Sequence, residues 1–429
     1  MTPTVSIQQL RVGMYVHLDL SWMSHPFPRS SFKIESDEQI QTIRTLGLSR
    51  VRWDPERSDP DEPARMSLPA EPGPTSAAVQ PEARPRTPGE IEAEARRRLL
   101  AEQRAASQLC EMQYQEAGKA WRKAHDRVLK EPQAARQDTE ALSQALLDKM
   151  LVEGEMCIRV LNTASGDRAT AHAMNVAVVS MLMGRMLGLA EPELAELGAG
   201  ALLHDVGKLG VPERLRHPDD KFTPAEAAAY ADHVNQGQFQ ARRMGTGAAV
   251  TSVITQHHEM ADGSGFPRRL SGDAISMPAR IVALVNRFDN LCNPPSLARA
   301  LTPHEALSTL FAHSRAKYDA TVLNAFIRMM GVYPAGSVVQ LTDDRFGLVV
   351  SVNSLRPLKP RVLVYDSKVP RDEALHLDLE RAPDLGIRRS IRAAQLPAAA
   401  LDYLAPRPRV AYFFESGAAP LVDNETPAG

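Results

Sequence analysis

An adjacent His-Asp pair inside an apolar segment is the feature of this sequence that most clearly points to chemistry. His204 and Asp205 lie between Leu203 and Val206, so we expect both polar side chains to be buried or nearly so. A buried carboxylate requires a cation or strong hydrogen-bond donors, because an unpaired buried charge is costly, and a metal ion is the simplest partner. Lys208 follows on the same side of a helix, which favours an anionic substrate such as a phosphate. For an isolated pair, a core histidine satisfied by a neighbouring side chain remains the alternative.

Four further histidines favour a metal site over that alternative. Of the twelve histidines in the chain, five fall on predicted helices or helix ends: His172, His204, His233, His257 and His258. His172 shares a helix face with Val176 and Val179, so it is expected to point into the core. His257 and His258 are adjacent and could serve one metal from two sides or two metals. Nitrogen and carboxylate ligands without thiolate suit Fe, Mn, Zn, Co or Ni, and a carboxylate between two histidine groups suits a two-metal centre for phosphoryl chemistry.

A predominantly helical segment must position these side chains. Apolar spacing predicts helices over residues 139–152, 169–187, 191–204, 248–258, 278–291 and 319–330. Thr223 and Thr302 each begin a Thr-Pro-x-Glu cap, which predicts two more helices, the first of them carrying His233. The stretch 262–267 is rich in glycine and proline and must leave helical geometry.

The flanking segments have other compositions and predict a multidomain protein. We expect a central all-α helical domain, a small α+β N-terminal domain and a small β-rich C-terminal module. A Pro-rich stretch with almost no large apolar residues is expected to form a flexible linker. The predicted boundaries are residues 1–54 for the N-terminal domain, 55–88 for the linker, 89–150 for connecting helices, 151–335 for the helical domain, 336–415 for the β-rich module and 416–429 for a tail.

Strand patterns support the two flanking domains. Alternating residues predict strands at 13–20 and 49–53 in the first, a hairpin at 337–341 and 347–352 in the last, and further strands at 360–365 and 410–414. For the residues from 88 to 130, a long connecting helix with a weak coiled-coil seam and a solvated helix packed on its own domain both stay open.

Composition excludes several classes of function. The formal net charge is −2 and aromatic residues make up 5% of the chain, so we expect no DNA or RNA partner. The three cysteines lie far apart, which argues against a disulfide framework or a thiolate zinc site and fits the cytoplasm. No run of 18 apolar residues is present, so no membrane span is expected.

Taken together, the motifs resemble the HD superfamily of metal-dependent phosphohydrolases, and within it the HD-GYP family, over about residues 150–335. The residues that carry the resemblance are His172, His204-Asp205 with Lys208, His233, and His257-His258-Glu259 followed by Asp262-Gly263-Ser264-Gly265-Phe266-Pro267. The central domain is therefore expected to be an HD-type domain. Residues 10–16 also resemble the small uncharacterised domain often found before HD-GYP modules.

The resemblance implies a function and a ligand set. Known members of the family hydrolyse cyclic di-GMP to pGpG or on to GMP, with two or three iron or manganese ions. Carried over to this chain, one divalent metal ion would take His172, His204 and Asp205. The second would take Asp205, His233, His257 and His258. Asp205 would bridge the metals, and Lys208 would neutralise the phosphate during in-line attack on a phosphodiester. A diguanylate cyclase is an implied partner, and a homodimer is possible.

Three departures from the family pattern affect the expected site. Asn286 replaces the terminal Asp ligand, and its neutral amide oxygen would coordinate more weakly. Asp289 could replace that ligand if the helix rotated, but we expect it to be a carboxylate either on the helix surface or behind a metal ligand. The family's Arg-Pro-Tyr motif is missing; Arg280 or Arg287 would then bind the dinucleotide instead, and the alternative for either is a solvated arginine. Arg168 replaces the Glu of three-metal members, and two metals are therefore expected.

The Gly265-Phe266-Pro267 loop has Phe in place of the family's Tyr, which removes a hydroxyl and keeps the ring. We expect this loop to shape the substrate pocket or to contact a diguanylate cyclase partner. Two alternatives remain open beside a cyclic di-GMP phosphodiesterase. One is a catalytically weakened cyclic di-GMP receptor or protein-interaction scaffold, which Asn286 and the missing Arg-Pro-Tyr would favour. The other is a phosphohydrolase of a different nucleotide.

Overall fold

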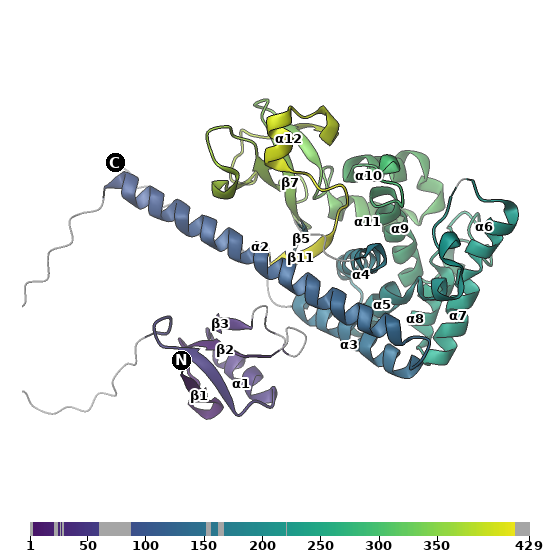
Figure 1. The fold of residues 1–429 in the computed structure, drawn as a ribbon, viewed down its shortest axis with the longest axis horizontal. Helices are drawn as coiled ribbons and strands as arrows, with labels where there is room; N and C mark the ends of the chain where they lie inside the picture. Colours follow the sequence, from purple (N-terminus) through teal and green to yellow (C-terminus); the bar gives the residue numbers. More distant parts are fainter. Residues whose placement is uncertain are drawn as a thin grey trace, which may run out of the picture. The chain divides into compact units, whose positions relative to one another are not determined.

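The computed structural model describes residues 3–20, 25, 27, 30–59, 87–151, 156–161, 167–219 and 221–416. It separates into two compact units, residues 1–102 and 103–429 (Figure 1). Most of the predicted linker, from residue 60 to 86, and the predicted tail from residue 417 onward lie outside the described residues.

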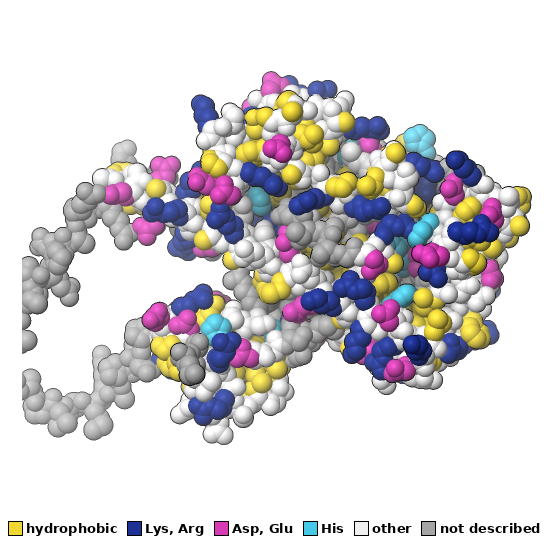
Figure 2. All heavy atoms as spheres, viewed as in Figure 1, with side chains coloured by type: hydrophobic (Ala, Val, Ile, Leu, Met, Phe, Trp, Pro, Cys, Tyr) yellow, Lys and Arg dark blue, Asp and Glu magenta, His cyan; other side chains and the backbone are white. Residues whose placement is uncertain are grey.

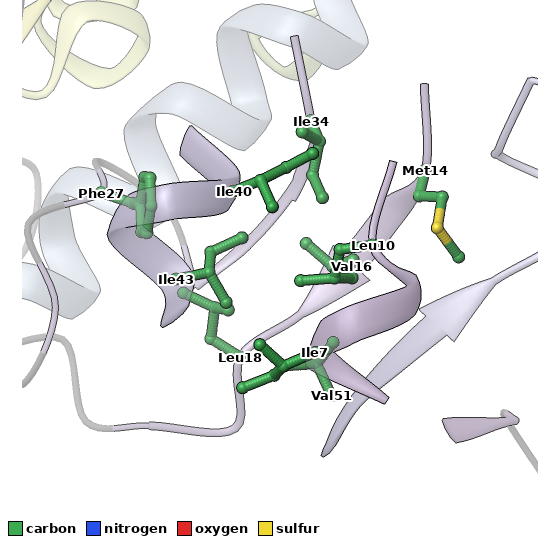
Figure 3. Close-up of a cluster of buried hydrophobic side chains, with 10 residues drawn as sticks. All are labelled: Ile7, Leu10, Met14, Val16, Leu18, Phe27, Ile34, Ile40, Ile43 and Val51. Atoms are coloured by element: carbon green, nitrogen blue, oxygen red, sulfur yellow. The ribbon is translucent and has the colours of Figure 1, made fainter. Parts of the chain in front are cut away.

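The first unit contains a small antiparallel sheet with one helix, as the α+β prediction expected. Its strands follow the order β1-β4-β2-β3. Their bounds are β1 (Thr4–Ser6), β2 (Tyr15–His17), β3 (Ser31–Lys33) and β4 (Arg50–Asp54). Helix α1 (Asp37–Thr45) begins at Ser36, whose side chain accepts a hydrogen bond from the Gln39 backbone. Figure 3 shows Val16 of the sheet and Ile40 and Ile43 of the helix in the shared apolar core of this unit.

A single long helix, α2 (Pro88–Arg127), begins in the first unit and continues into the second. From Cys110 onward, its side chains at Tyr114, Ala117 and Trp121 are buried. The Trp121 indole donates a hydrogen bond of 3.0 Å to the Leu202 carbonyl. This half of the helix therefore packs on its own domain, which was one of the two open interpretations.

The second unit contains the helices that carry the candidate ligands. They are α3 (Pro132–Leu151), α4 (Arg168–Met186), α5 (Glu191–Leu203), α6 (Pro224–Ala231), α7 (His233–Met244), α8 (Ala248–Gln256), α9 (Met277–Cys292), α10 (Pro303–His313) and α11 (Ala320–Met330). Helix α4 is apolar on nearly all sides between Ala173 and Gly184, so it is buried among α5, α9 and the C-terminal strand (Figure 1). A 3₁₀ turn, η3 (Val206–Gly210), follows α5 and packs on α7.

Two predicted helices differ from the observed ones. The single helix expected after Thr223 is wrong, because the chain forms α6 and α7 with a break at Asp232, and His233 begins the second helix. The helix expected to reach residue 258 ends at Gln256, so His257 and His258 lie just beyond it. In both places the candidate ligands stand at helix ends, where side chains can converge from several directions.

A seven-stranded antiparallel sheet completes the second unit. Strands β6 (Val338–Leu341) and β7 (Phe346–Asn353) form the predicted hairpin, and α12 (Ala398–Leu404) packs nearby. The other C-terminal strands are β8 (Arg361–Val364), β9 (His376–Asp378), β10 (Ile387–Ile391) and β11 (Tyr412–Ser416). The main path of the sheet runs β10-β6-β7-β5-β11, and β8 and β9 extend from β7.

Strand β5 (Met156–Val160) was not predicted, although it lies between β7 and β11 in this sheet. All five of its residues are buried, so the sequence lacks the apolar-polar alternation that indicates a half-exposed strand. The C-terminal sheet is therefore completed by a segment that directly precedes the HD-like helices.

The surface of the described residues carries mixed charge. Figure 2 shows Lys and Arg side chains interspersed with Asp and Glu on the face in view, in keeping with the formal net charge of −2. None of the helices within the described ranges combines the length and apolar composition that a membrane span needs.

Candidate metal centre

The carboxylate of Asp205 faces two pairs of imidazole nitrogens. Its Oδ2 lies 3.6 Å from His172 Nε2 and 3.5 Å from His204 Nε2. Its Oδ1 lies 3.6 Å from His233 Nε2 and 3.7 Å from His257 Nε2. The Nε2 atoms of His172 and His204 lie 3.2 Å apart, and those of His233 and His257 lie 3.3 Å apart. Each oxygen of one carboxylate thus serves a different histidine pair.

These side chains form two groups that share Asp205 and could each hold a metal ion. In each group one possible ligand atom per residue lies within 4.8 Å of every other: the groups are His172, His204 and Asp205, and Asp205, His233, His257 and His258. The elements that carry them, α4, α5, α7 and α8, lie side by side in the helical domain (Figure 1). This grouping is the same division of residues that the family resemblance implies for two metals.

Backbone carbonyls fix the orientation of three of the imidazole rings. The Nδ1 atoms of His204, His233 and His257 lie 2.7, 2.6 and 3.0 Å from the carbonyl oxygens three residues earlier in the chain. A carbonyl only accepts, so each Nδ1 carries the hydrogen and donates it. The Nε2 lone pairs are therefore free and point toward Asp205, as a neutral imidazole ligand requires.

The electrostatic environment keeps these groups in the protonation states that metal binding needs. Burial lowers the pKa of His204 to about 4, although Asp205 partly opposes the shift. Burial and then the neighbouring histidines hold the pKa values of His257 and His258 well below the usual range. Burial opposes ionisation of Asp205, but Lys208 and the histidines outweigh it and hold the pKa of its carboxyl well below the usual value. Near neutral pH His204, His257 and His258 are therefore neutral, and the carboxylate of Asp205 is charged.

Two buried atoms of the ligand groups have no hydrogen-bond partner among the described residues. They are Asp205 Oδ1 and His258 Nε2, both members of the second group. Leaving a buried carboxylate oxygen and an imidazole nitrogen unpaired is costly unless another ligand satisfies them. A divalent cation that accepts oxygen and nitrogen ligands fits both atoms.

Asp289 on α9 contacts the far side of His172. Its Oδ2 lies 2.6 Å from His172 Nδ1, and Asp289 is only 2% exposed. Of the two roles expected for Asp289, a carboxylate on the helix surface and one behind a ligand, this contact agrees with the second, since a carboxylate on Nδ1 orients the ring. Its Oδ1 accepts hydrogen bonds from Asn175 and Asn293, at 2.7 and 2.8 Å.

The sequence analysis missed these two amides, although helix spacing could have found them. Asn175 follows His172 by three residues, and Asn293 follows Asp289 by four. Residues three or four apart share a helix face, so each amide is a natural neighbour of the residue it supports.

Asn286, the predicted substitute ligand, is buried on α9 one turn before Asn290. Its amide oxygen accepts a hydrogen bond of 2.6 Å from Asn290 Nδ2. Coordination of a metal by this oxygen would require it to share or leave that contact, and it stays a prediction.

Lys208 lies against the bridging carboxylate. Its Nζ donates a hydrogen bond of 2.6 Å to Asp205 Oδ2, and its side chain is 17% exposed. The turn that carries it fits closely on α7, because a Cβ on Gly207 would lie 1.8 Å from the His233 carbonyl oxygen. Only glycine permits this approach, which holds Asp205 and Lys208 beside His233.

The glycine-proline loop also reaches the site. Phe266 stacks on His258 with ring centroids 4.5 Å apart. A Cβ on Gly265 would lie 2.5 Å from the His258 carbonyl oxygen, so the loop is tightly folded here. Glu259 accepts hydrogen bonds from the backbone of Arg268 and Leu270, at 2.8 and 2.9 Å, and these hold the far end of the loop. Pro267 follows Phe266 in this loop, and substrate contact by the Gly265–Pro267 segment stays a prediction.

The two arginines predicted to bind substrate lie in different settings. Arg280 donates hydrogen bonds to the Ile275 carbonyl and to Asp319 and Asp273, at 2.8, 3.0 and 2.9 Å. A substrate would have to compete with these partners. Arg287 is exposed on α9, and its charge partly offsets the burial that raises the pKa of Tyr230.

Arg168 adds a further positive charge that interacts with Asp205. Arg168 begins α4, and its Nη2 is buried without a hydrogen-bond partner among the described residues. Burial and then Arg409 lower the pKa of Arg168, while Asp205 and Asp289 oppose the shift. Burial and then Arg168 and Lys208 lower the pKa of His217 to about 4. His217 was not singled out from the sequence, because it lies in a loop with no spacing that ties it to the other histidines.

Comparison with known families agrees with this geometry. A family model described as "HD domain" matches residues 155–322, which contain every residue of the two ligand groups. The middle of this chain is an HD domain. A second model, described as "Domain of unknown function (DUF3391)", matches residues 3–139. The two matches confirm the resemblance of the HD domain and of the small domain before it.

Curated relatives of the HD domain are named as cyclic dinucleotide phosphodiesterases. Cyclic di-GMP phosphodiesterase PA4108 from Pseudomonas aeruginosa is 29% identical over 391 residues, covering 89% of this chain and 90% of that protein. Cyclic di-GMP phosphodiesterase response regulator RpfG from Xanthomonas campestris pv. campestris is 34% identical, covering 35% of this chain and 40% of that protein. 3'3'-cGAMP-specific phosphodiesterase 3 from Vibrio cholerae is 28% identical, covering 40% and 37%.

A solved structure titled Bd1817, a HDG"Y"P protein from Bdellovibrio bacteriovorus, is 15% identical with a TM-score of 0.40. That match covers 76% of this chain and 97% of the other.

Proposed function

We propose that this chain is a metal-dependent phosphodiesterase that hydrolyses cyclic di-GMP to pGpG, GMP or both. The observation that carries the proposal is the shared carboxylate of Asp205, whose two oxygens each face a pair of imidazole nitrogens. The similarity to a named cyclic di-GMP phosphodiesterase over 89% of this chain supports the choice of substrate.

Two divalent ions, Fe or Mn, would occupy the site. One would be held by His172, His204 and Asp205, and the other by Asp205 with three histidines: His233, His257 and His258. When bound, such ions act as Lewis acids on the phosphoryl group and on the attacking water. The absence of thiolate among the ligand groups suits Fe or Mn.

The chain's own residues would bind and neutralise the substrate. Lys208 carries a positive charge beside Asp205 and would pair with non-bridging phosphate oxygens. Arg168 occupies the position where three-metal members of the family have Glu, and its cationic side chain opposes a third metal there. Gly265, Phe266 and Pro267 would line the substrate pocket beside His258, with Arg287 at its exposed side.

A second candidate function is a cyclic di-GMP receptor with weakened catalysis. Asn286 favours this candidate, because its amide oxygen is held by Asn290 and carries no charge to add to the ligand set. The absence of the Arg-Pro-Tyr motif also favours it. A receptor would bind intact cyclic di-GMP saturably and release no product.

A different cyclic dinucleotide is the other candidate substrate. Three relatives from Vibrio cholerae are named as 3'3'-cGAMP-specific phosphodiesterases, and they are 27–30% identical over 162–171 residues. The sequence-based predictions of a diguanylate cyclase partner, a homodimer and a cytoplasmic location stay predictions beside this proposal.

The test is turnover by protein purified anaerobically and loaded with Fe(II) or Mn(II). We expect hydrolysis of cyclic di-GMP with pGpG or GMP as products, and loss of turnover in a His204→Ala variant, which removes one ligand from the first group. The matched control is His313→Ala, which changes an exposed histidine at the end of α10.

Each other outcome points to a different function. Parental turnover in His204→Ala would refute the assignment of the site. Faster turnover of 3'3'-cGAMP than of cyclic di-GMP would change the substrate. Saturable binding of intact cyclic di-GMP without turnover would identify the receptor.

A further inference from the structure

We infer that the C-terminal strand β11 and the residues just before it are a working part of the metal centre. Asn175 and Asn293 attach Asp289, the partner of His172, to the backbone of residues 410–412. These two asparagines are positioning residues for the His172 half of the site. The inference rests on the proposed two-metal function and adds a structural requirement to it.

The two asparagine amides bridge the same pair of acceptors. Asn175 Nδ2 donates to Asp289 Oδ1 at 2.7 Å and to the Val410 carbonyl at 3.0 Å. Asn293 Nδ2 donates to Asp289 Oδ1 at 2.8 Å and to the same Val410 carbonyl at 2.9 Å. One carboxylate oxygen and one backbone oxygen are thus held together by two amides from two different helices.

The amide oxygens complete the connection to the strand. Asn175 Oδ1 accepts from the Tyr412 backbone N–H at 2.8 Å, and Asn293 Oδ1 accepts from the Val410 backbone N–H at 2.9 Å. The side chains involved are buried, with Asn175, Asp289 and Asn293 exposed by 1%, 2% and 7%. In a buried network each of these bonds is needed, because a lost partner leaves an unsatisfied polar group.

Among the ligand histidines, the network contacts His172, which belongs to the first ligand group. His172 is oriented by the Asp289 carboxylate, whereas His204, His233 and His257 are oriented by carbonyls of their own helical turns. Loosening Asp289 should therefore weaken the ion held by His172 and His204, and leave the ion held by the other histidines unchanged.

Strand β11 is itself held from the other side. It pairs along its length with β5, and Cys110 of helix α2 contacts the Phe414 carbonyl at 3.7 Å. Tyr114 of α2 packs edge-on against Phe413, with ring centroids 6.0 Å apart. A displacement of the sheet or of α2 would therefore reach His172 through the two asparagines.

The test measures metal binding rather than turnover. The full chain and the variants Asn175→Ala and Asn293→Ser are dialysed against a series of Mn(II) concentrations, and bound manganese per chain is determined. The parent is expected to bind two ions. Each variant is expected to retain one ion at parental affinity and to bind the other about 10- to 100-fold more weakly, the usual effect of removing an outer partner of a metal ligand. Because each variant keeps the other asparagine, a loss of folding in one leaves the other to be measured.

The matched control is Asn324→Ala, which removes the amide of an exposed asparagine on α11 that takes no part in this network. It is expected to bind both ions as the parent does. Parental affinity for both ions in a folded asparagine variant would overturn the inference. So would an equal loss at both sites, or the same selective loss in Asn324→Ala.

The outcomes for the parent separate this inference from the proposed function. A parent that binds no Mn(II) would overturn both. A parent that binds two ions but hydrolyses no cyclic dinucleotide would refute the proposed activity, and a selective loss in the asparagine variants would still support the role of β11.

Discussion

At the scale of single residues, Asp205 carries the charge around which the centre is built. Lys208 Nζ lies 2.6 Å from its Oδ2, so this oxygen has a counter-charge supplied by the protein, whereas Oδ1 has no hydrogen-bond partner among the described residues. The charge on Oδ2 is therefore already balanced by Lys208, whereas Oδ1 requires an added cation. This asymmetry agrees with a bridging role for the carboxylate.

The buried neutral state of His204 predicts a pH-dependent stability of the metal-free chain. Burial lowers the pKa of His204 to about 4 from its ordinary 6.5. Between these values the unfolded chain binds a proton that the folded chain does not, so the free energy of unfolding falls as the pH falls from about 6.5 to about 4. The gap corresponds to a loss on the order of 3 kcal/mol from this residue.

Urea denaturation of the metal-free chain across this pH window checks the prediction. A His204→Gln variant is expected to show a shallower decrease, because glutamine binds no proton in either state. Equal slopes in the two proteins would contradict the assignment of the proton uptake to His204.

At the scale of elements, the close packing of η3 on α7 sets the distance between Asp205 and His233. A Cβ at Gly207 would lie 1.8 Å from the His233 carbonyl oxygen and 2.3 Å from the Gly237 nitrogen, both of them backbone atoms. We expect Gly207→Ala to force the two elements apart, to destabilise the fold by about 1–3 kcal/mol or more, and to weaken metal binding.

The matched control is Gly89→Ala at the start of α2, where a Cβ would meet nothing within 4 Å. It is expected to change the free energy of unfolding by less than about 1 kcal/mol. Urea denaturation and Mn(II) dialysis of both variants test the prediction, and an unaltered Gly207→Ala protein would show that the turn can move away without loss.

At the scale of the whole second unit, strand β5 joins the helical domain to the C-terminal sheet. Arg159 on β5 forms a buried ion pair of 2.5 Å with Glu415 on β11, and the side chains are only 6% and 10% exposed. Arg159 also donates to Ser107 of α2 at 2.5 Å. One guanidinium therefore connects three segments that are far apart in the sequence.

Removing one charge of this pair should be more harmful than removing both. We expect Arg159→Met to destabilise the chain by about 3–5 kcal/mol, because Glu415 is then left buried and, among the described residues, its remaining ion-pair partner is Arg361 at 3.8 Å. The double variant Arg159→Met/Glu415→Leu should recover most of that loss. Urea denaturation of the two single variants and the double variant measures the coupling, and purely additive losses would contradict it.

Much of the organisation of this chain follows from local sequence signals. The Thr223 and Thr302 caps, the apolar spacing of α4 and α9, and the hairpin of β6 and β7 depend on residues close together in the chain. Such features could be predicted because helix and turn formation depend on spacings of two to four residues. The set of candidate ligands could be named for the same reason, together with a family pattern that joins them.

The contacts between these residues depend on packing between segments that are far apart in the chain. His172 and Asp289 are separated by 117 positions, and so are Asn293 and Val410, so no local spacing predicts their contacts. The break before His233 and the pairing of β5 with β11 also depend on packing partners elsewhere in the chain. Local sequence patterns indicated which side chains could bind metal and which segments would be helical. Asp205 lies between two histidine pairs, and His172 is linked to the C-terminal strand, because α4, α5, α7, α8 and α9 pack together. Residues that meet through such packing have no fixed spacing in the sequence, so their contacts could not be predicted from it.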